Sequence, residues 1–74
     1  MKATKDEVEQ IVSEAKDLNL KVEQGSGMLW ITGGNLGTLS DLITNLTKKG
    51  MDRNLFGFAQ PDIGQAHIWV RIES

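Results

Sequence analysis

A pattern of one helix-like run followed by two strand-like runs occurs twice in this chain, and this repeat constrains the fold more than any other feature. The second strand-like run of each copy places a tryptophan between aliphatic residues, as Leu29-Trp30-Ile31 and as Ile68-Trp69-Val70. Successive side chains of a strand point to opposite faces, so the tryptophans and the aliphatic residues cannot share a face. A chain of 74 residues has few elements with which to cover both faces. We therefore expect one face of the sheet to be open or to belong to a partner.

The first helix is predicted over residues 5–18. Apolar residues recur there at the spacing of one helical face, and the charged residues fall elsewhere. Thr4 and Glu7 form a capping-box pair, in which the threonine oxygen accepts from a first-turn amide and the glutamate reaches back to the cap amide. The apolar face consists of Val8, Ile11, Val12, Ala15 and Leu18.

A hairpin is predicted after this helix. Leu20 and Val22 alternate with charged residues up to the turn at 24–27, and Met28 to Thr32 reads as the second strand. The buried face of this hairpin is expected to carry Leu20, Val22, Leu29 and Ile31.

The second helix is predicted from residue 36 or 38 to residue 49, where a cationic last turn precedes Gly50. The glycine-rich segment 33–38 before it lacks the lysine and hydroxyl of a phosphate loop, so we interpret it as a turn with an Asn or Thr cap. Two further strands, 56–59 and 66–73, are separated by a turn at 60–65 in which proline and glycine suit the turn positions. These strands are expected to form a second hairpin.

The predicted fold class is α+β: a two-layer sandwich in the order αββαββ, with a four-stranded, mainly antiparallel sheet packed against two helices. The length indicates a single small domain, residues 1–74. The sequence leaves the strand order open.

The alternation on the last strand predicts which side chains form a candidate binding surface. Its aliphatic residues are expected to face the helices, which turns the tryptophans towards the uncovered face. The alternative is that both tryptophans are core residues, sheltered by sheet twist or a loop. Phe56 and Phe58 share a face, but the sequence does not say which. The expected partner-binding residues are Trp30, Trp69, Arg71, His67, Lys21 and Met28.

Composition argues against several classes of function. The absence of cysteine removes disulfides, thiolate zinc sites and thiol nucleophiles, and the single histidine cannot build a ligand cluster, so no metal or cofactor is expected. None of the serines stands in a nucleophile context, and so short a chain has little room for a supported cleft, so we do not expect an enzyme. With no apolar signal core and no bilayer-length apolar run, the chain reads as cytoplasmic and without a membrane partner.

The remaining hypotheses concern what the tryptophan-bearing face binds. Tryptophan and arginine often anchor protein interfaces, so the leading interpretation is a non-catalytic module for protein-protein interaction or self-association, for example as a homodimer. The alternative is single-stranded nucleic acid, whose bases stack on aromatic rings while phosphates pair with cations. The net charge of −2 disfavours the alternative. The sequence does not identify the partner.

A series of mostly apolar motifs runs through the chain: Met28-Leu29-Trp30-Ile31-Thr32-Gly33-Gly34, Leu39, Leu42, Leu46, Lys49-Gly50, Phe56-Gly57-Phe58-Ala59 and Ile68-Trp69. In these residues the chain resembles a small accessory domain of unknown function found at the ends of large bacterial helicase- or nuclease-related proteins. In that family the final hairpin is glycine-rich and basic, whereas residues 60–67 here are not. The resemblance implies a stand-alone relative of an accessory module, with no catalytic residues to carry over. A freestanding acidic domain of this size also suits a phage or mobile-element regulator that binds a host protein.

Overall fold

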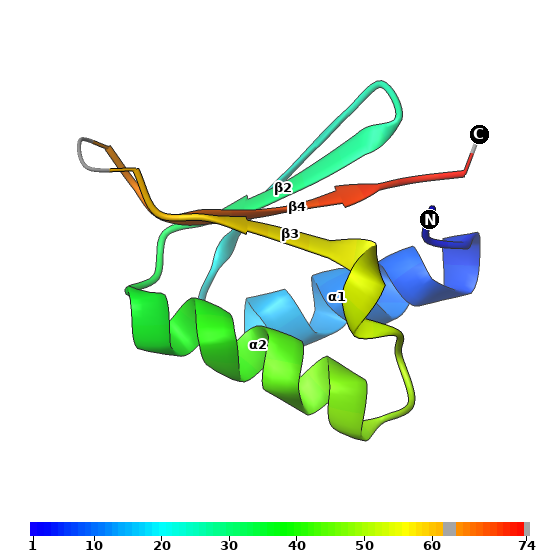
Figure 1. The fold of residues 1–74 in the computed structure, drawn as a ribbon, viewed down its shortest axis with the longest axis horizontal. Helices are drawn as coiled ribbons and strands as arrows, with labels where there is room; N and C mark the ends of the chain where they lie inside the picture. The colour runs from blue at the N-terminus through cyan, green and yellow to red at the C-terminus, as the bar shows by residue number, and fades with distance from the viewer. Residues whose placement is uncertain (62–63, 74) are drawn as a thin grey trace.

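Both helices lie on the same side of a four-stranded sheet in the computed structural model, which describes residues 1–61 and 64–73 (Figure 1). This is the predicted two-layer α+β arrangement in the order αββαββ. A single 3-10 turn, η1, precedes the third strand. The elements are α1 (Lys5–Asp17), β1 (Lys21–Gly25), β2 (Met28–Thr32), α2 (Leu36–Lys48), η1 (Arg53–Leu55), β3 (Phe56–Ala59) and β4 (His67–Arg71).

Helix α1 begins at the predicted capping box. The Glu7 N–H donates to the Thr4 hydroxyl at 3.2 Å, and the Thr4 N–H donates to the Glu7 carboxylate at 2.9 Å. The helix ends at Asp17, one residue before the predicted end, with Leu18 as the C-cap. Asn19 then adopts a φ of 58°, a left-handed conformation that asparagine tolerates better than most residues and that turns the chain into β1.

Helix α2 takes the earlier of its two predicted starts. Its N-cap is Asn35, whose side-chain oxygen accepts from the Thr38 N–H at 2.8 Å. At the other end Lys49 is the C-cap, and Gly50 has a φ of 98°, so the glycine serves the left-handed turn that its position predicts. The glycine-rich segment before α2 is thus a capped turn, as expected.

The sheet order is β1-β2-β4-β3, and every pair of neighbouring strands is antiparallel. Each αββ half contributes an outer strand and a central one, and the two central strands, β2 and β4, pair along the middle. In that pairing Trp30 lies directly opposite Trp69. The repeat in the sequence therefore corresponds to a sheet in which the two tryptophans are cross-strand neighbours.

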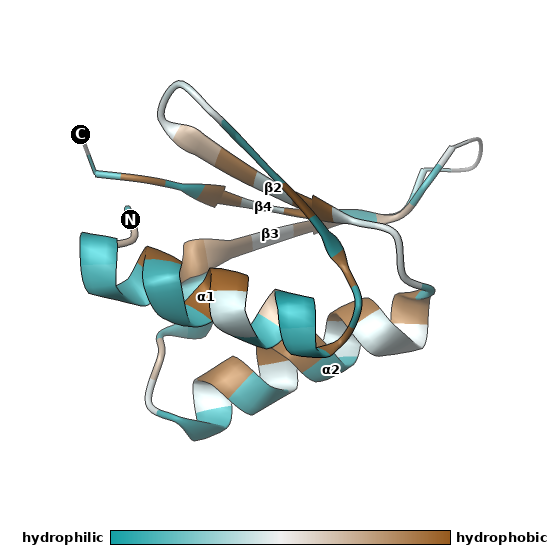
Figure 2. Cartoon of the chain, turned by 180° about the vertical axis from the view of Figure 1, so that it is seen from behind, coloured by the Kyte–Doolittle hydropathy of each residue, from teal (hydrophilic) through white to brown (hydrophobic). Residues whose placement is uncertain are grey.

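The core lies between the sheet and the helices. Leu29 and Ile31 of β2 and Ile68 and Val70 of β4 are fully buried, as the alternation predicts. Apolar surfaces of both helices turn towards the sheet (Figure 2). Burial of one such side chain contributes about 1.5–3 kcal/mol. The fully buried helix residues are Ile11, Ala15, Leu39, Leu42 and Leu46.

Strand β4 is shorter than the predicted run 66–73, and its continuation pairs with the N-terminal segment. Ala3 forms a parallel bridge with Ile72, in which the Ala3 N–H donates to the Arg71 carbonyl at 2.8 Å and the Glu73 N–H donates to the Ala3 carbonyl at 3.0 Å. No sequence pattern indicated this pairing. Between β3 and β4, Gly64 has the predicted positive φ, at 114°, while residues 62–63 of the predicted turn lie outside the described residues.

Within the described ranges, neither helix has the length and apolar character required to cross a bilayer.

Candidate binding surface

The face of the sheet turned away from the helices is the candidate site, and we call it the open face (Figure 1). Strand register and side-chain alternation place all six predicted partner-binding residues on it. Its residues within the strands are Lys21, Glu23 and Gly25 of β1, Met28, Trp30 and Thr32 of β2, Gly57 and Ala59 of β3, and His67, Trp69 and Arg71 of β4.

The two tryptophans of the open face differ in exposure. Trp30 is 39% exposed, whereas Trp69 is half-buried. The reason is Gly57, which lies opposite Trp69 on β3: a Cβ at position 57 would collide with the Trp69 indole, so this ring lies over the glycine backbone. The predicted exposed platform is therefore confirmed for Trp30, and Trp69 is partly sheltered by its neighbouring strand.

His67 joins the two indoles into one aromatic cluster. Its ring centroid lies 5.9 Å from that of Trp30 and 5.9 Å from that of Trp69, with interplanar angles of 60° and 46°. Tilted rings at this separation attract each other through edge-to-face contacts. Nδ1 of His67 lies 3.2 Å from the Gln65 carbonyl oxygen, which can only accept, so this bond places the proton on Nδ1.

Charged residues surround this cluster: Lys21 and Arg71 lie at the ends of their strands, and Glu23 lies in the middle of β1, opposite Trp30. Lys21 Nζ lies 3.5 Å from the Glu23 carboxylate, and both side chains are well exposed, so their pairing contributes little stability. Arg71 is exposed and lies opposite the half-buried Met28 in the β2–β4 register. The open face thus combines an aromatic centre with a thin, nearly neutral charged rim.

The phenylalanines, whose face the sequence left open, lie on the helix side. Phe56 is opposite Val70 and Phe58 is opposite Ile68, and both rings pack partly buried against the core. Neither phenylalanine therefore belongs to the open face. The alternation of large and small residues in β3 is the signal that indicates this arrangement, because only the small residues leave room for an indole from β4.

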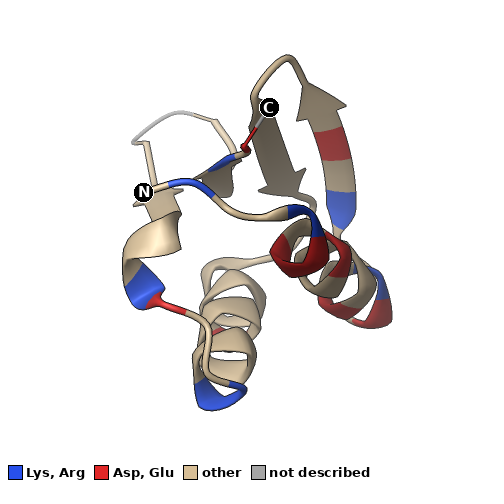
Figure 3. Cartoon of the chain, turned by 90° about the vertical axis from the view of Figure 1, so that its right-hand side faces the viewer, with Lys and Arg blue, Asp and Glu red and all other residues tan. Residues whose placement is uncertain are grey.

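Most of the negative charge lies elsewhere in the molecule. Five of the ten acidic residues belong to α1, where they are opposed by two lysines. Figure 3 shows these acidic positions along α1, on the helix layer rather than on the open face. The net charge of the chain is therefore a poor measure of the charge on the open face.

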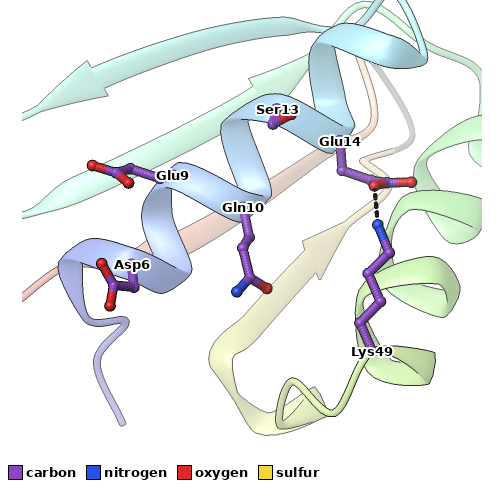
Figure 4. Close-up of a pocket in the computed structure, with 6 residues that line it drawn as sticks. All are labelled: Asp6, Glu9, Gln10, Ser13, Glu14 and Lys49. Atoms are coloured by element: carbon purple, nitrogen blue, oxygen red, sulfur yellow. Dashed lines mark hydrogen bonds and ion pairs between the residues drawn. The ribbon is translucent and has the colours of Figure 1, made fainter.

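A shallow polar depression on α1 also contains titratable groups, and Figure 4 shows its lining. Glu14 accepts from Lys49 Nζ at 2.8 Å and from Asn45 Nδ2 at 3.3 Å, which ties α1 to the end of α2. The hydrogen bond from Lys49 is the main reason that the pKa of Glu14 lies below its usual range. The part of the chain that the structure describes contains no group of three metal-ligating side chains. We interpret this depression as a helix-helix contact.

No protein-family model, curated protein or solved structure matches this chain. The function proposed below therefore depends on the geometry of the open face, and the resemblance to an accessory domain stays a prediction.

Proposed function

We propose that this chain is a non-catalytic binding module that acts by protein-protein interaction or self-association through the open face. The observation that carries the proposal is the exposed Trp30 side chain at the centre of the sheet, in contact with His67 and flanked across the strand by Trp69. A large, rigid ring of this kind gains much apolar contact area on binding and loses little conformational entropy.

The layout of the open face supports a protein partner. Stable protein interfaces combine an aromatic centre, which becomes fully desolvated, with a polar rim that stays in contact with water. Trp30, His67 and Trp69 form such a centre, and Lys21 and Arg71 lie towards the ends of their strands. Truncating a central tryptophan commonly costs 2 kcal/mol or more of binding free energy, which is about thirtyfold in affinity.

Single-stranded nucleic acid is the second candidate, because the acidic residues of α1 lie away from the open face (Figure 3). Bases would stack on Trp30 and Trp69, and Arg71 would pair with a phosphate. The number of cations argues against this candidate. Lys21 already pairs with Glu23, so the open face can make about one or two contacts with phosphates. A plot of log affinity against log salt concentration would then have a slope of only about −0.7 to −1.4.

A pair of alanine variants tests the proposal. Trp30→Ala removes the central ring, and Leu36→Ala removes another exposed apolar side chain, 43% exposed, from the start of α2. Sedimentation equilibrium over a concentration series measures self-association. Quantitative affinity capture from the native host, followed by titration of each captured protein in purified form, measures other partners. We expect about thirtyfold weaker binding for Trp30→Ala and unchanged binding for Leu36→Ala.

Two results would contradict the proposal. If wild-type protein and both variants behave alike in self-association and in titrations with partners, the open face is not the binding surface. If the protein instead binds single-stranded oligonucleotides, and if this affinity falls both with added salt and in the Arg71→Ala variant, then the ligand is single-stranded nucleic acid.

A further inference from the structure

The two edges of the sheet differ in chemistry. Strands β1 and β3 are the outer strands, and each presents unpaired backbone groups along one side. β1 carries the exposed charges of Lys21 and Glu23, which is how natural sheets discourage pairing with another chain. β3 has the sequence Phe-Gly-Phe-Ala, without charge or proline. The β3 edge is therefore the one that is open to an additional strand.

The hydrogen bonds of β4 show which backbone groups of β3 face outwards. The Arg71 carbonyl accepts from Ala3 at 2.8 Å, whereas the Ile72 N–H donates to Gly27 at 3.0 Å, beside β2. Arg71 therefore directs its backbone groups away from β2, to the side where β3 lies. The side to which the backbone groups point alternates from one residue of a strand to the next. Trp69, two residues before Arg71, therefore also directs its backbone groups towards β3.

Trp69 pairs with Gly57, so Gly57 uses its N–H and C=O for the ladder with β4. By alternation its neighbours, Phe56 and Phe58, direct their backbone groups to the free edge. In agreement with this, the Phe56 N–H donates to the Arg53 carbonyl of η1 and not to β4. The edge therefore offers the Phe56 carbonyl and both backbone groups of Phe58, to which no other backbone group in residues 1–61 and 64–73 bonds.

A small cavity lies beside this edge, between β3 and α2, which run side by side in Figure 1. Its volume is about 120 Å³, comparable to a cavity that holds a small apolar molecule. Because the side chains of an added strand alternate between faces, every second one would point to the helix side, where this cavity lies. The lining residues are Ser40, Ile43 and Thr44 of α2, Phe56 and Phe58 of β3, and Arg53 of η1.

Arg53 sets the direction of the added strand. The η1 turn closes the edge beyond Phe56, so a strand added there has to end or turn away beside Arg53. Arg53 is exposed, and no described carboxylate lies within 4.0 Å of its guanidinium group. A chain that ends at this point with a free carboxylate would complement the charge, since guanidinium binds carboxylates through two parallel hydrogen bonds.

We propose that the β3 edge binds the C-terminal segment of a partner protein as a fifth, antiparallel strand. One residue of the segment exchanges two backbone hydrogen bonds with Phe58, an aliphatic side chain enters the cavity between β3 and α2, and the terminal carboxylate pairs with Arg53. Main-chain pairing of this kind provides affinity, and the cavity provides specificity. This surface is separate from the open face and does not depend on it.

The test uses synthetic peptides and the full chain. The peptides are N-terminally acetylated and about six residues long, which is enough to span the β3 edge. Each position in turn carries Val, Ile, Leu or Phe. Every peptide is made in two forms, one with a free C-terminal carboxylate and one with a C-terminal amide. Binding is followed by amide chemical shifts and hydrogen exchange. We expect peptides with a free carboxylate to bind about tenfold or more tightly than their amides, and to slow exchange of the Phe58 amide.

Exposed positions give variants that are expected to keep the fold. Thr44→Phe fills the cavity and Arg53→Glu reverses the charge, while Lys48→Glu makes the same charge change on α2 outside the cavity lining. Peptide binding should fall about tenfold or more in the first two and stay unchanged in Lys48→Glu and Trp30→Ala. The proposal is overturned if no peptide in the set binds, if binding leaves the Phe58 amide unaffected, or if Thr44→Phe binds as well as wild type.

Discussion

Replacing Gly57 by alanine is expected to destabilise the protein, because the new methyl group would occupy space that the Trp69 indole fills. A Cβ at position 57 would collide with the benzene ring atoms of that side chain. The φ of Gly57 lies outside the left-handed region, so alanine can adopt the backbone conformation and the effect is steric. Either the indole leaves its position over β3, or β3 shifts away from β4.

The expected magnitude follows from two opposing effects. Overpacking of a well-packed site costs about 1–3 kcal/mol. Alanine in place of glycine within a strand recovers about 0.5–1 kcal/mol, because the unfolded chain loses less entropy. When the middle of each range is taken, the net destabilisation is about 1 kcal/mol, or roughly 4–8 °C in Tm for a chain of this length.

Gly25 provides a matched control, since it also lies in a strand but, apart from its two chain neighbours, no heavy atom of the described residues lies within 4 Å of the position that an added methyl group would take. Urea unfolding followed by circular dichroism should give a lower midpoint for Gly57→Ala and an unchanged or slightly higher one for Gly25→Ala. In a Trp69→Ala background the cost of Gly57→Ala should disappear, because the two changes share one contact. Equal midpoints for the two glycine variants, or a cost that persists without the indole, would refute this reasoning.

Three further predictions concern the tryptophans, the first helix and the helix-helix contact. The variants Trp69→Phe and Trp30→Phe each retain one tryptophan, Trp30 in the first and Trp69 in the second. Acrylamide should quench the fluorescence of Trp30 more strongly than that of Trp69, and Trp30 should emit at the longer wavelength. Equal quenching in the two variants would contradict the difference in burial. Thr4→Ala should lower the free energy of unfolding by about 1 kcal/mol in urea denaturation, because it removes the capping hydrogen bond of α1, and an unchanged midpoint would contradict that role. The pKa of Glu14 is lower in the folded chain than in the unfolded chain. The contact with Lys49 therefore stabilises the fold at pH values above the usual pKa of glutamate, and this stabilisation is lost as the pH falls through the lowered pKa. In an NMR titration, Lys49→Met should raise the pKa of Glu14, and an unmoved titration curve would show that Lys49 is not the cause.

Local features of the sequence predicted both helices and all four strands, but not the 3-10 turn η1 or the ends of β1 and β4. The capping box at Thr4 and the bounds of β2 and β3 depend on neighbours within a few positions, and the structure agrees with them. The predicted turn at 24–27 is too long, because β1 continues to Gly25, which pairs with Met28. Side-chain alternation also predicted the orientation of Trp30 and Trp69 correctly. Both helices end one residue before the predicted C-terminal residue, because weak competing hydrogen bonds decide where the last turn of a helix ends.

Features of the site that depend on distant partners were not predictable in this way. The sheltering of Trp69 requires Gly57 on another strand, and the segment that follows β4 pairs with Ala3 near the opposite end of the chain. The face of Phe56 and Phe58 could be decided only once β3 was paired with β4.

The sequence by itself therefore determined the elements of this protein, their caps and the two-sided character of its strands, because these depend on backbone preferences and on side-chain periodicity over a few residues. The tertiary structure alone decided the strand order β1-β2-β4-β3, the pairing of Trp30 with Trp69, and the free edge at β3. These features arise from contacts between residues far apart in the chain, whose free energies become effective only when the helices and the sheet bury a common core.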